Sequence, residues 1–156
     1  MKKNILVPVI TLIILLLLPA TVFAATDSST VSGTISDTLS ITAPDSFTFA
    51  SLEPGATSES NNGNIAISSN LAGSWNLKAD SNSSGLMENG GVQLGHPIAI
   101  KGGMVSDYTS LASQVTLTDA GSGSTNITVS FSQQVTFTDA PGSYSMTVNF
   151  TVTANS

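Results

Sequence analysis

The chain contains no cysteine and no arginine, and only 9% of its residues are charged. Without cysteine it can form neither a disulfide nor a lipid-modified cysteine, so hydrophobic packing must stabilise the fold. Clustered lysine and arginine supply most of the affinity of proteins for phosphate backbones. Nucleic acid is therefore not an expected partner.

Catalytic groups are equally scarce. The one histidine, His96, precedes Pro97 in a glycine-rich turn, and no G-x-S-x-G motif accompanies it. Zinc is not expected, because one histidine without cysteine cannot complete a site. No spacing of carboxylates favours the pair that a glycosidase needs. We expect a protein that is not an enzyme and has no cofactor.

Calcium is the inorganic ligand that the composition permits best. Asp119 and Asp139 lie in predicted turns, where carboxylates and backbone carbonyls can surround an ion. The loop pattern D-x-[DN]-x-[DN]-G is absent. Aspartate also stabilises turns through its own hydrogen bonds, and this structural role is the preferred interpretation.

The first 24 residues have the order of a secretory signal peptide. Lys2 and Lys3 precede an apolar run over 5–18, and a small-residue cleavage site ends at Ala24. A retained membrane anchor is the alternative. Cleavage would leave residues 25–156 as one domain, with two lysines against ten carboxylates and a net charge near −8. The expected location is extracellular, at the cell surface, with membrane contact only through the signal peptide before its cleavage.

Beyond residue 30 apolar residues alternate with hydroxyl and amide residues, which is typical of strands with one buried face. The pattern predicts an all-β, two-sheet antiparallel β-sandwich of about seven to nine strands, jelly-roll or Greek-key-like. Turns are expected at 52–55 and around Gly95 and Pro97, and loops over 58–63 and 80–91. Residues 102–112 are the least regular stretch of the sequence. The apolar positions of the earlier strands are Val31, Ile35, Leu39 and Ile41; Phe47 and Phe49; Ile65 and Ile67; Trp75, Leu77 and Ala79; Val92 and Leu94; Ile98 and Ile100.

A short sequence occurs twice near the end of the chain. Residues 115–122 read VTLTDAGS, and residues 135–143 read VTFTDAPGS. Each copy is followed by another alternating segment, the second ending in the apolar positions 146, 148, 150 and 152. The spacing predicts two successive β-hairpins.

Three asparagines satisfy the N-glycosylation sequon, namely Asn82, Asn126 and Asn149. Asn126 and Asn149 have the parity opposite to the apolar face, so they are expected to point outward. Several chance matches are also expected in so Asn- and Thr-rich a chain. Glycosylation is therefore a minority hypothesis.

The sequence Trp75-Asn76-Leu77, together with Gly142-Ser143-Tyr144 and Phe150-Thr151-Val152, resembles the WxL domain of bacterial cell-surface proteins. Phe150 and Val152 stand where the second motif of that family has Trp and Leu. The resemblance implies a β-sandwich held non-covalently on the cell envelope, with peptidoglycan or another envelope polymer as ligand. The motif positions Trp75, Leu77, Tyr144, Phe150 and Val152 are interpreted as structural.

The order of the first strands is also similar to that in TasA-type biofilm fibres and archaeal bundling pili. That resemblance implies a filament subunit whose segment 25–43 completes the sheet of a neighbour, with Val31, Ile35, Leu39 and Ile41 as donor side chains. Pairing of this strand within its own domain is the alternative. A third hypothesis is a carbohydrate-binding adhesin that uses Tyr108 or Trp75 as an exposed ring. The expected partners are the envelope, other surface proteins or further copies of the chain.

Overall fold

The computed structural model describes residues 28–155 and divides the chain into two units, Met1–Thr34 and Ile35–Ser156. The predicted signal peptide lies outside the described residues. Residues 28–34 have no regular secondary structure. No helix with the length and apolarity to span a membrane occurs among residues 28–155. All strands of the described residues belong to the second unit.

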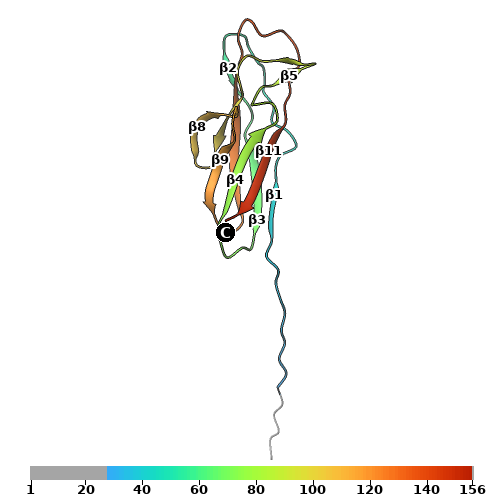
Figure 1. The fold of residues 1–156 in the computed structure, drawn as a ribbon, viewed down its shortest axis with the longest axis vertical. Helices are drawn as coiled ribbons and strands as arrows, with labels where there is room; N and C mark the ends of the chain where they lie inside the picture. Colours follow the sequence, from blue (N-terminus) through green and yellow to red (C-terminus); the bar gives the residue numbers. More distant parts are fainter. Residues whose placement is uncertain (1–27, 156) are drawn as a thin grey trace, which may run out of the picture. The chain divides into compact units, whose positions relative to one another are not determined.

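The second unit is all-β, which confirms the predicted fold class (Figure 1). Its strands outnumber the seven to nine expected because three of them are only two or three residues long. The described residues form β1 (Leu39–Thr42), β2 (Thr57–Glu59), β3 (Gly63–Ser69), β4 (Trp75–Ser81), β5 (Glu88–Asn89), β6 (Val92–Gln93), β7 (Ala99–Gly102), β8 (Val105–Ser110), β9 (Val115–Gly121), β10 (Thr125–Gln134) and β11 (Val148–Ala154).

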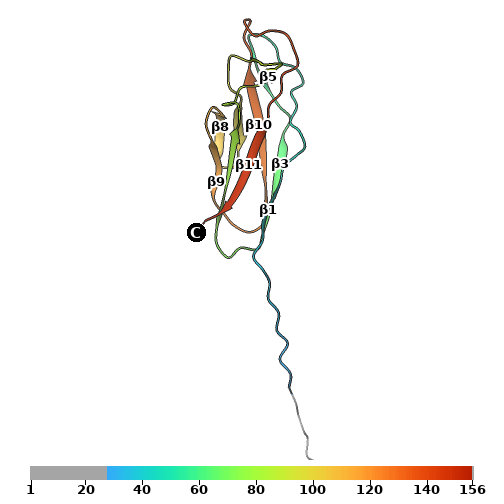
Figure 2. The same ribbon diagram turned by 45° about the vertical axis from the view of Figure 1, so that its right-hand side comes forward.

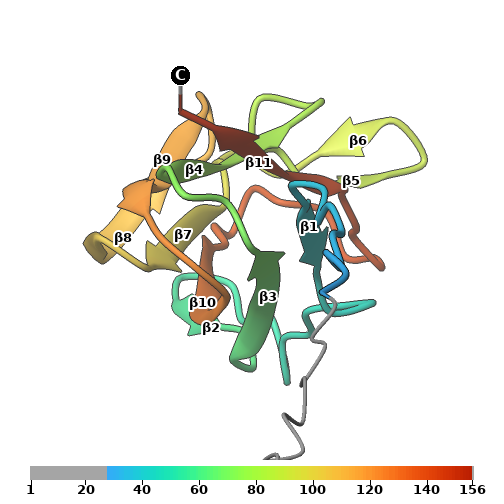
Figure 3. The same cartoon turned by 90° about the horizontal axis from the view of Figure 1, so that it is seen from below.

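Two antiparallel sheets build the sandwich. The larger has the order β1-β3-β10-β7-β8, with β2 also paired to β10, and the smaller has the order β11-β4-β9. A view along the strands separates β9, β4 and β11 from β3 and β10 (Figure 3). The short hairpin β5–β6 forms a third sheet.

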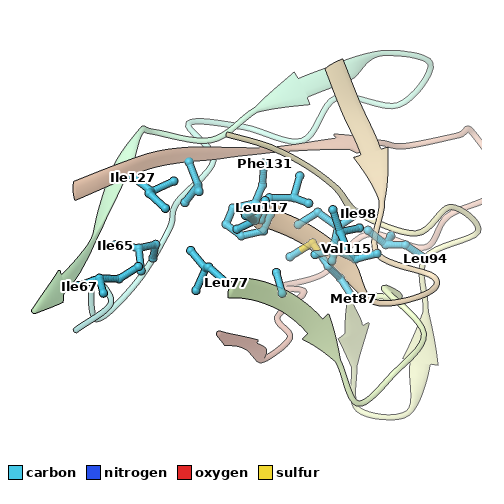
Figure 4. Close-up of a cluster of buried hydrophobic side chains, with 14 of the residues drawn as sticks. Ile65, Ile67, Leu77, Met87, Leu94, Ile98, Val115, Leu117, Ile127 and Phe131 are labelled. Carbon is cyan, nitrogen blue, oxygen red and sulfur yellow. The ribbon is translucent and has the colours of Figure 1, made fainter. Parts of the chain in front are cut away.

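The core fills the space between the sheets because each strand turns its alternate apolar residues inward. In β4 the side chains of Trp75, Leu77 and Ala79 are 0% exposed. In Figure 4 Leu77 and Leu117, from the smaller sheet, point toward residues of the larger sheet that include Ile127. Full burial of one such side chain contributes about 1.5–3 kcal/mol, so this shared core is the main stabilising element.

The first strand is shorter than predicted. Only Leu39–Thr42 forms β1, which pairs with β3, while Val31 and Ile35 lie outside any strand and are exposed. Pro44 follows soon after β1, and proline cannot donate to a ladder. Phe47 and Phe49 were expected in a second strand; they instead pack on the core from irregular backbone, with one isolated bridge between Phe49 and Ser60.

Both predicted hairpins are wrong. Strands β9 and β10 follow each other in the chain but lie in different sheets, and so do β10 and β11. Each connection is an arch that crosses from one sheet to the other. Alternation shows that one face of a strand is apolar, but this face can be buried equally well by a neighbour in the same sheet or by the opposite sheet.

The predictions for the turns and loops have mixed outcomes. The turn at 52–55 is confirmed, since Gly55 has a φ of 84° and the N–H of Ala56 donates to the carbonyl of Glu53 at 3.1 Å. The expected loop at 58–63 is wrong in part, because β2 includes residues 58 and 59 and β3 begins at Gly63. Residues 102–112, the least regular stretch of the sequence, contain β8. Their polar residues lack the alternation that reveals a strand. The expected loop at 80–91 begins only after β4 ends at Ser81, and it contains β5.

Candidate functional site

One concave feature of the second unit is a groove at one side of the sandwich. The edge strands β1 and β11 lie next to each other there (Figure 2). Beyond the end of β1 and before the start of β11, residues 43–50 and 142–148 line a groove of about 810 Å³. This volume lies within the range of binding pockets, about 300–1,000 Å³.

Phe47 forms the floor of the groove and joins the two sheets. Its ring lies 4.7 Å, centroid to centroid and edge-on, from that of Phe131 in β10, and 6.4 Å from that of Phe150 in β11. Such edge-to-face pairs contribute about 0.5–1.5 kcal/mol beyond area burial. A Cβ atom on Gly63 would lie 2.5 Å from the Phe47 ring, so this position admits only glycine without a shift.

Residues 142–147 form one wall of the groove, and the hairpin β5–β6 holds this wall in place. The N–H of Glu88 donates to the carbonyl of Ser145 at 2.9 Å, and the N–H of Ser145 donates back to Glu88 at 3.0 Å. The hydroxyl of Tyr144 donates to the carbonyl of Ala140 at 2.8 Å. These bonds fix the wall, although its residues belong to no strand and only Ser145 forms an isolated β-bridge.

The groove is almost uncharged, and neutral polar and apolar side chains line it in similar measure. Asp45 is the only carboxylate among its lining residues, which include neither histidine nor lysine. Apolar side chains of an incoming segment could pack against the apolar part of this lining. Its half-buried apolar residues include Phe47, Phe49, Tyr144, Met146, Val148 and Phe150.

Residues 43–47 and 146–147 belong to no strand. Apart from Pro44, which has no N–H, these residues carry backbone N–H and C=O groups with which an added strand could pair. The groove thus combines apolar side chains with backbone outside the sheets, and an extended peptide can use both.

The structure places Trp75 and Leu77 on the strand next to the one that carries Phe150 and Val152. Val152 is the register partner of Leu77, and Phe150 is that of Ala79, on the neighbouring strands β11 and β4. The ring nitrogen of Trp75 donates to the carbonyl of Gly123 at 3.1 Å. Because Trp75 is 0% exposed, it cannot present its ring to a sugar.

Tyr108 does not offer a free ring either. It lies on β8, with Nζ of Lys101 4.7 Å from the ring centroid, and its hydroxyl lies 3.1 Å from Oγ of Ser130. The strongly exposed aromatic ring is instead Phe137, at 86%. Its parity matches that of Phe131 and Val135, so the sequence pattern pointed to the core.

Two of the three sequon asparagines contact each other. The side-chain amide of Asn149 donates to Oδ1 of Asn82 at 3.1 Å. Asn126 is exposed near the start of β10, in the larger sheet. The hydroxyl of Thr128, in the same sequon, donates to Oδ1 of Asn64 at 2.7 Å.

The carboxylate of Asp139 stabilises the turn in which it lies, whereas Asp119 is exposed in β9. The Asp139 carboxylate accepts hydrogen bonds from the N–H and hydroxyl of Thr136 and from the N–H of Gly95. These bonds, led by that from the N–H of Thr136, lower the pKa of Asp139, and charge on His96 adds to the effect. No group of three or more His, Asp or Glu side chains within residues 28–155 has the arrangement of a metal site.

Comparison with known proteins supplies no further assignment. The chain matches no protein-family model, and no curated protein is recognisably similar to it.

Proposed function

We propose that the protein is a secreted, non-enzymatic structural protein of the cell surface that assembles by donating residues 28–38 to the groove of another copy. The observation that carries the proposal is the exposure of two apolar side chains, Val31 at 95% and Ile35 at 87%. Both have the parity of Leu39 and Ile41, which β1 turns toward the core. Val31 and Ile35 thus continue the parity of the apolar face of β1 with their side chains exposed, with Gly33 and Asp37 at the same-parity positions between them and Leu39.

Two further observations support strand donation. Residues 28–36 carry no charge, so this part of the donor can enter without burying an unpaired ion. Asp37, the one charged residue of 28–38, lies at the end of the donor next to β1, and the groove lining contains one carboxylate. The unpaired backbone along 43–47 and 146–147 offers main-chain hydrogen bonds, which supply affinity in strand addition, while alternate side chains supply specificity. Envelope retention of the WxL-like kind gains no support from the buried positions of Trp75 and Leu77.

Paired substitutions in the full mature chain test the proposal. Val31→Asp is expected to abolish assembly, because the new carboxylate would enter a groove that offers no cation to pair with it. Ser32→Asp adds the same charge on the opposite face of the donor, and assembly should persist. Light scattering and electron microscopy measure the assembled fraction, and thermal unfolding verifies that both variants fold. Equal assembly of the two variants would contradict strand donation.

A further inference from the structure

Two asparagines hold the backbone of two threonines in the same way. The side-chain oxygen of Asn70 accepts from the backbone N–H of Thr38 at 2.6 Å and from the Thr38 hydroxyl at 3.1 Å. The backbone N–H of Asn70 donates back to the carbonyl of Thr38 at 3.3 Å. Asn61 repeats these three bonds on Thr48, at 2.7, 3.5 and 3.0 Å in the same order. We call each set of three bonds an asparagine clamp.

The two clamps lie at opposite ends of β3 and hold the two ends of the segment 38–48. Asn61 precedes β3 in the chain, and Asn70 follows it directly. Between the clamps, residues 39–42 pair with β3, whereas residues 43–47 belong to no strand and line the groove. The clamp at Thr48 therefore fixes the backbone next to Phe47, the floor of the groove, where no ladder does so.

The other clamp fixes the point at which the donor segment leaves the sheet. The side-chain amide of Asn70 also donates to the carbonyl of Ser36 at 3.0 Å, so one side chain holds the backbone on both sides of residue 37. Leu39 is the register partner of Ser69, so the clamp at Thr38 extends the pairing of β1 with β3 by one residue pair. The backbone is thus held up to Ser36, the neighbour of the donor residue Ile35.

We propose that both asparagines are positioning residues for strand donation, Asn70 in the chain that donates and Asn61 in the chain that accepts. This inference rests on the proposed function and adds a division of roles to it. A segment that becomes ordered on binding loses conformational entropy, and a segment that is already fixed loses less. Each clamp fixes its segment before two copies meet, so each should favour donation.

Crossed substitutions test the division of roles. A donor chain with Ile35→Cys and an acceptor chain with Met146→Cys, a position in the groove wall, should form a mixed disulfide dimer on mild oxidation. Asn70→Ala in the donor chain should slow this reaction about five-fold, which corresponds to one net hydrogen bond. The same substitution in the acceptor chain should not slow it. Asn61→Ala should have the opposite pattern and slow the reaction only from the acceptor chain.

Conservative variants separate the clamps from a general loss of structure. Asn61→Asp keeps the accepting oxygen and should restore the rate, because the side-chain nitrogen takes no part in that clamp. Asn70→Asp cannot donate to Ser36 and should restore the rate only in part. Asn62→Ala is the control, since Asn62 is exposed and its side chain makes no hydrogen bond within residues 28–155. Thermal unfolding verifies that every variant folds.

Two outcomes would overturn the inference. The first is a mixed dimer whose rate of formation responds to each alanine substitution equally in the donor and in the acceptor chain, or in neither. Strand donation itself would stand in that case. The second is the absence of a mixed dimer when both asparagines are intact, which overturns strand donation and the two positioning roles with it.

Discussion

Residues 115–122 and 135–143 begin with nearly the same letters, yet only the first segment is a strand. In β9, which pairs with β4, the side chain of Leu117 is fully buried in the core. The equivalent residue of the second segment, Phe137, is exposed at the tip of a turn closed by a 3.2 Å hydrogen bond from the N–H of Asp139 to the carbonyl of Thr136. Tertiary partners decide between the two structures, because the local sequences barely differ.

The two segments contact different tertiary partners. Gly121 allows the ring of Trp75 to lie against β9, and Trp75 then holds the following arch through Gly123. The second segment has Pro141 at the position equivalent to Gly121, and its Asp139 binds the N–H of Gly95 at 2.8 Å. One segment is therefore fixed by an aromatic ring in the core, and the other by a carboxylate at the surface.

The largest expected effect follows from truncation of the equivalent apolar residues. Leu117→Ala should lower the free energy of unfolding by about 3 kcal/mol, the usual cost of removing a buried leucine. Phe137→Ala should change it by less than about 0.5 kcal/mol. Chemical denaturation of both variants measures the difference. Similar losses for the two would show that the segments are not structurally distinct.

The contact between Gly121 and Trp75 should give the next largest effect. A Cβ atom on Gly121 would lie 2.4 Å from the buried indole ring. Gly121→Ala should therefore destabilise the fold by about 1–3 kcal/mol through overpacking. Gly73→Ala is the control, since its Cβ would make only an ordinary contact with Asn155. If denaturant midpoints of the two variants coincide, Trp75 does not constrain β9 as described.

The smallest effect should come from the aspartates. Asp139→Asn should lower the unfolding temperature at neutral pH, whereas Asp119→Asn should leave it unchanged, because only Asp139 accepts hydrogen bonds through its carboxylate. The folded-state pKa of Asp139 is lowered, so its contribution is complete above the unfolded value of about 3.9 and is lost as pH falls through the folded value.

Thermal melts between neutral and acidic pH provide the check. The difference between wild type and Asp139→Asn should shrink as the pH falls below about 4. A difference that stays constant across this range would rule out the ionised carboxylate as its source.

The sequence predicted those elements whose period is unambiguous. Ile65, Ile67, Trp75 and Leu77 were placed correctly because a long alternation of apolar and polar residues is typical of a strand with one buried face. The two arches were not predicted, because alternation does not identify the sheet that a strand joins. Strand β8 escaped notice because most of its side chains are polar.

The candidate site was only half visible in the sequence. Val31 and Ile35, the donor residues of the proposal, were singled out from their parity, and the structure shows that both are exposed. The groove could not be, since Phe47 and Met146 line it from irregular backbone that meets only after the chain has crossed between the sheets. A groove made from segments about 100 residues apart leaves no local pattern to read.

Disulfide trapping tests strand donation most directly, because the natural chain has no cysteine that could interfere. One chain would carry Ile35→Cys and the other Met146→Cys, a position in the groove wall, so a bond between them must join two copies. Mild oxidation of the mixture should give mostly the mixed covalent dimer, and Ser36→Cys in place of Ile35→Cys should give little. Failure of the mixed dimer to exceed the two like dimers, under conditions where the protein assembles, would contradict the account.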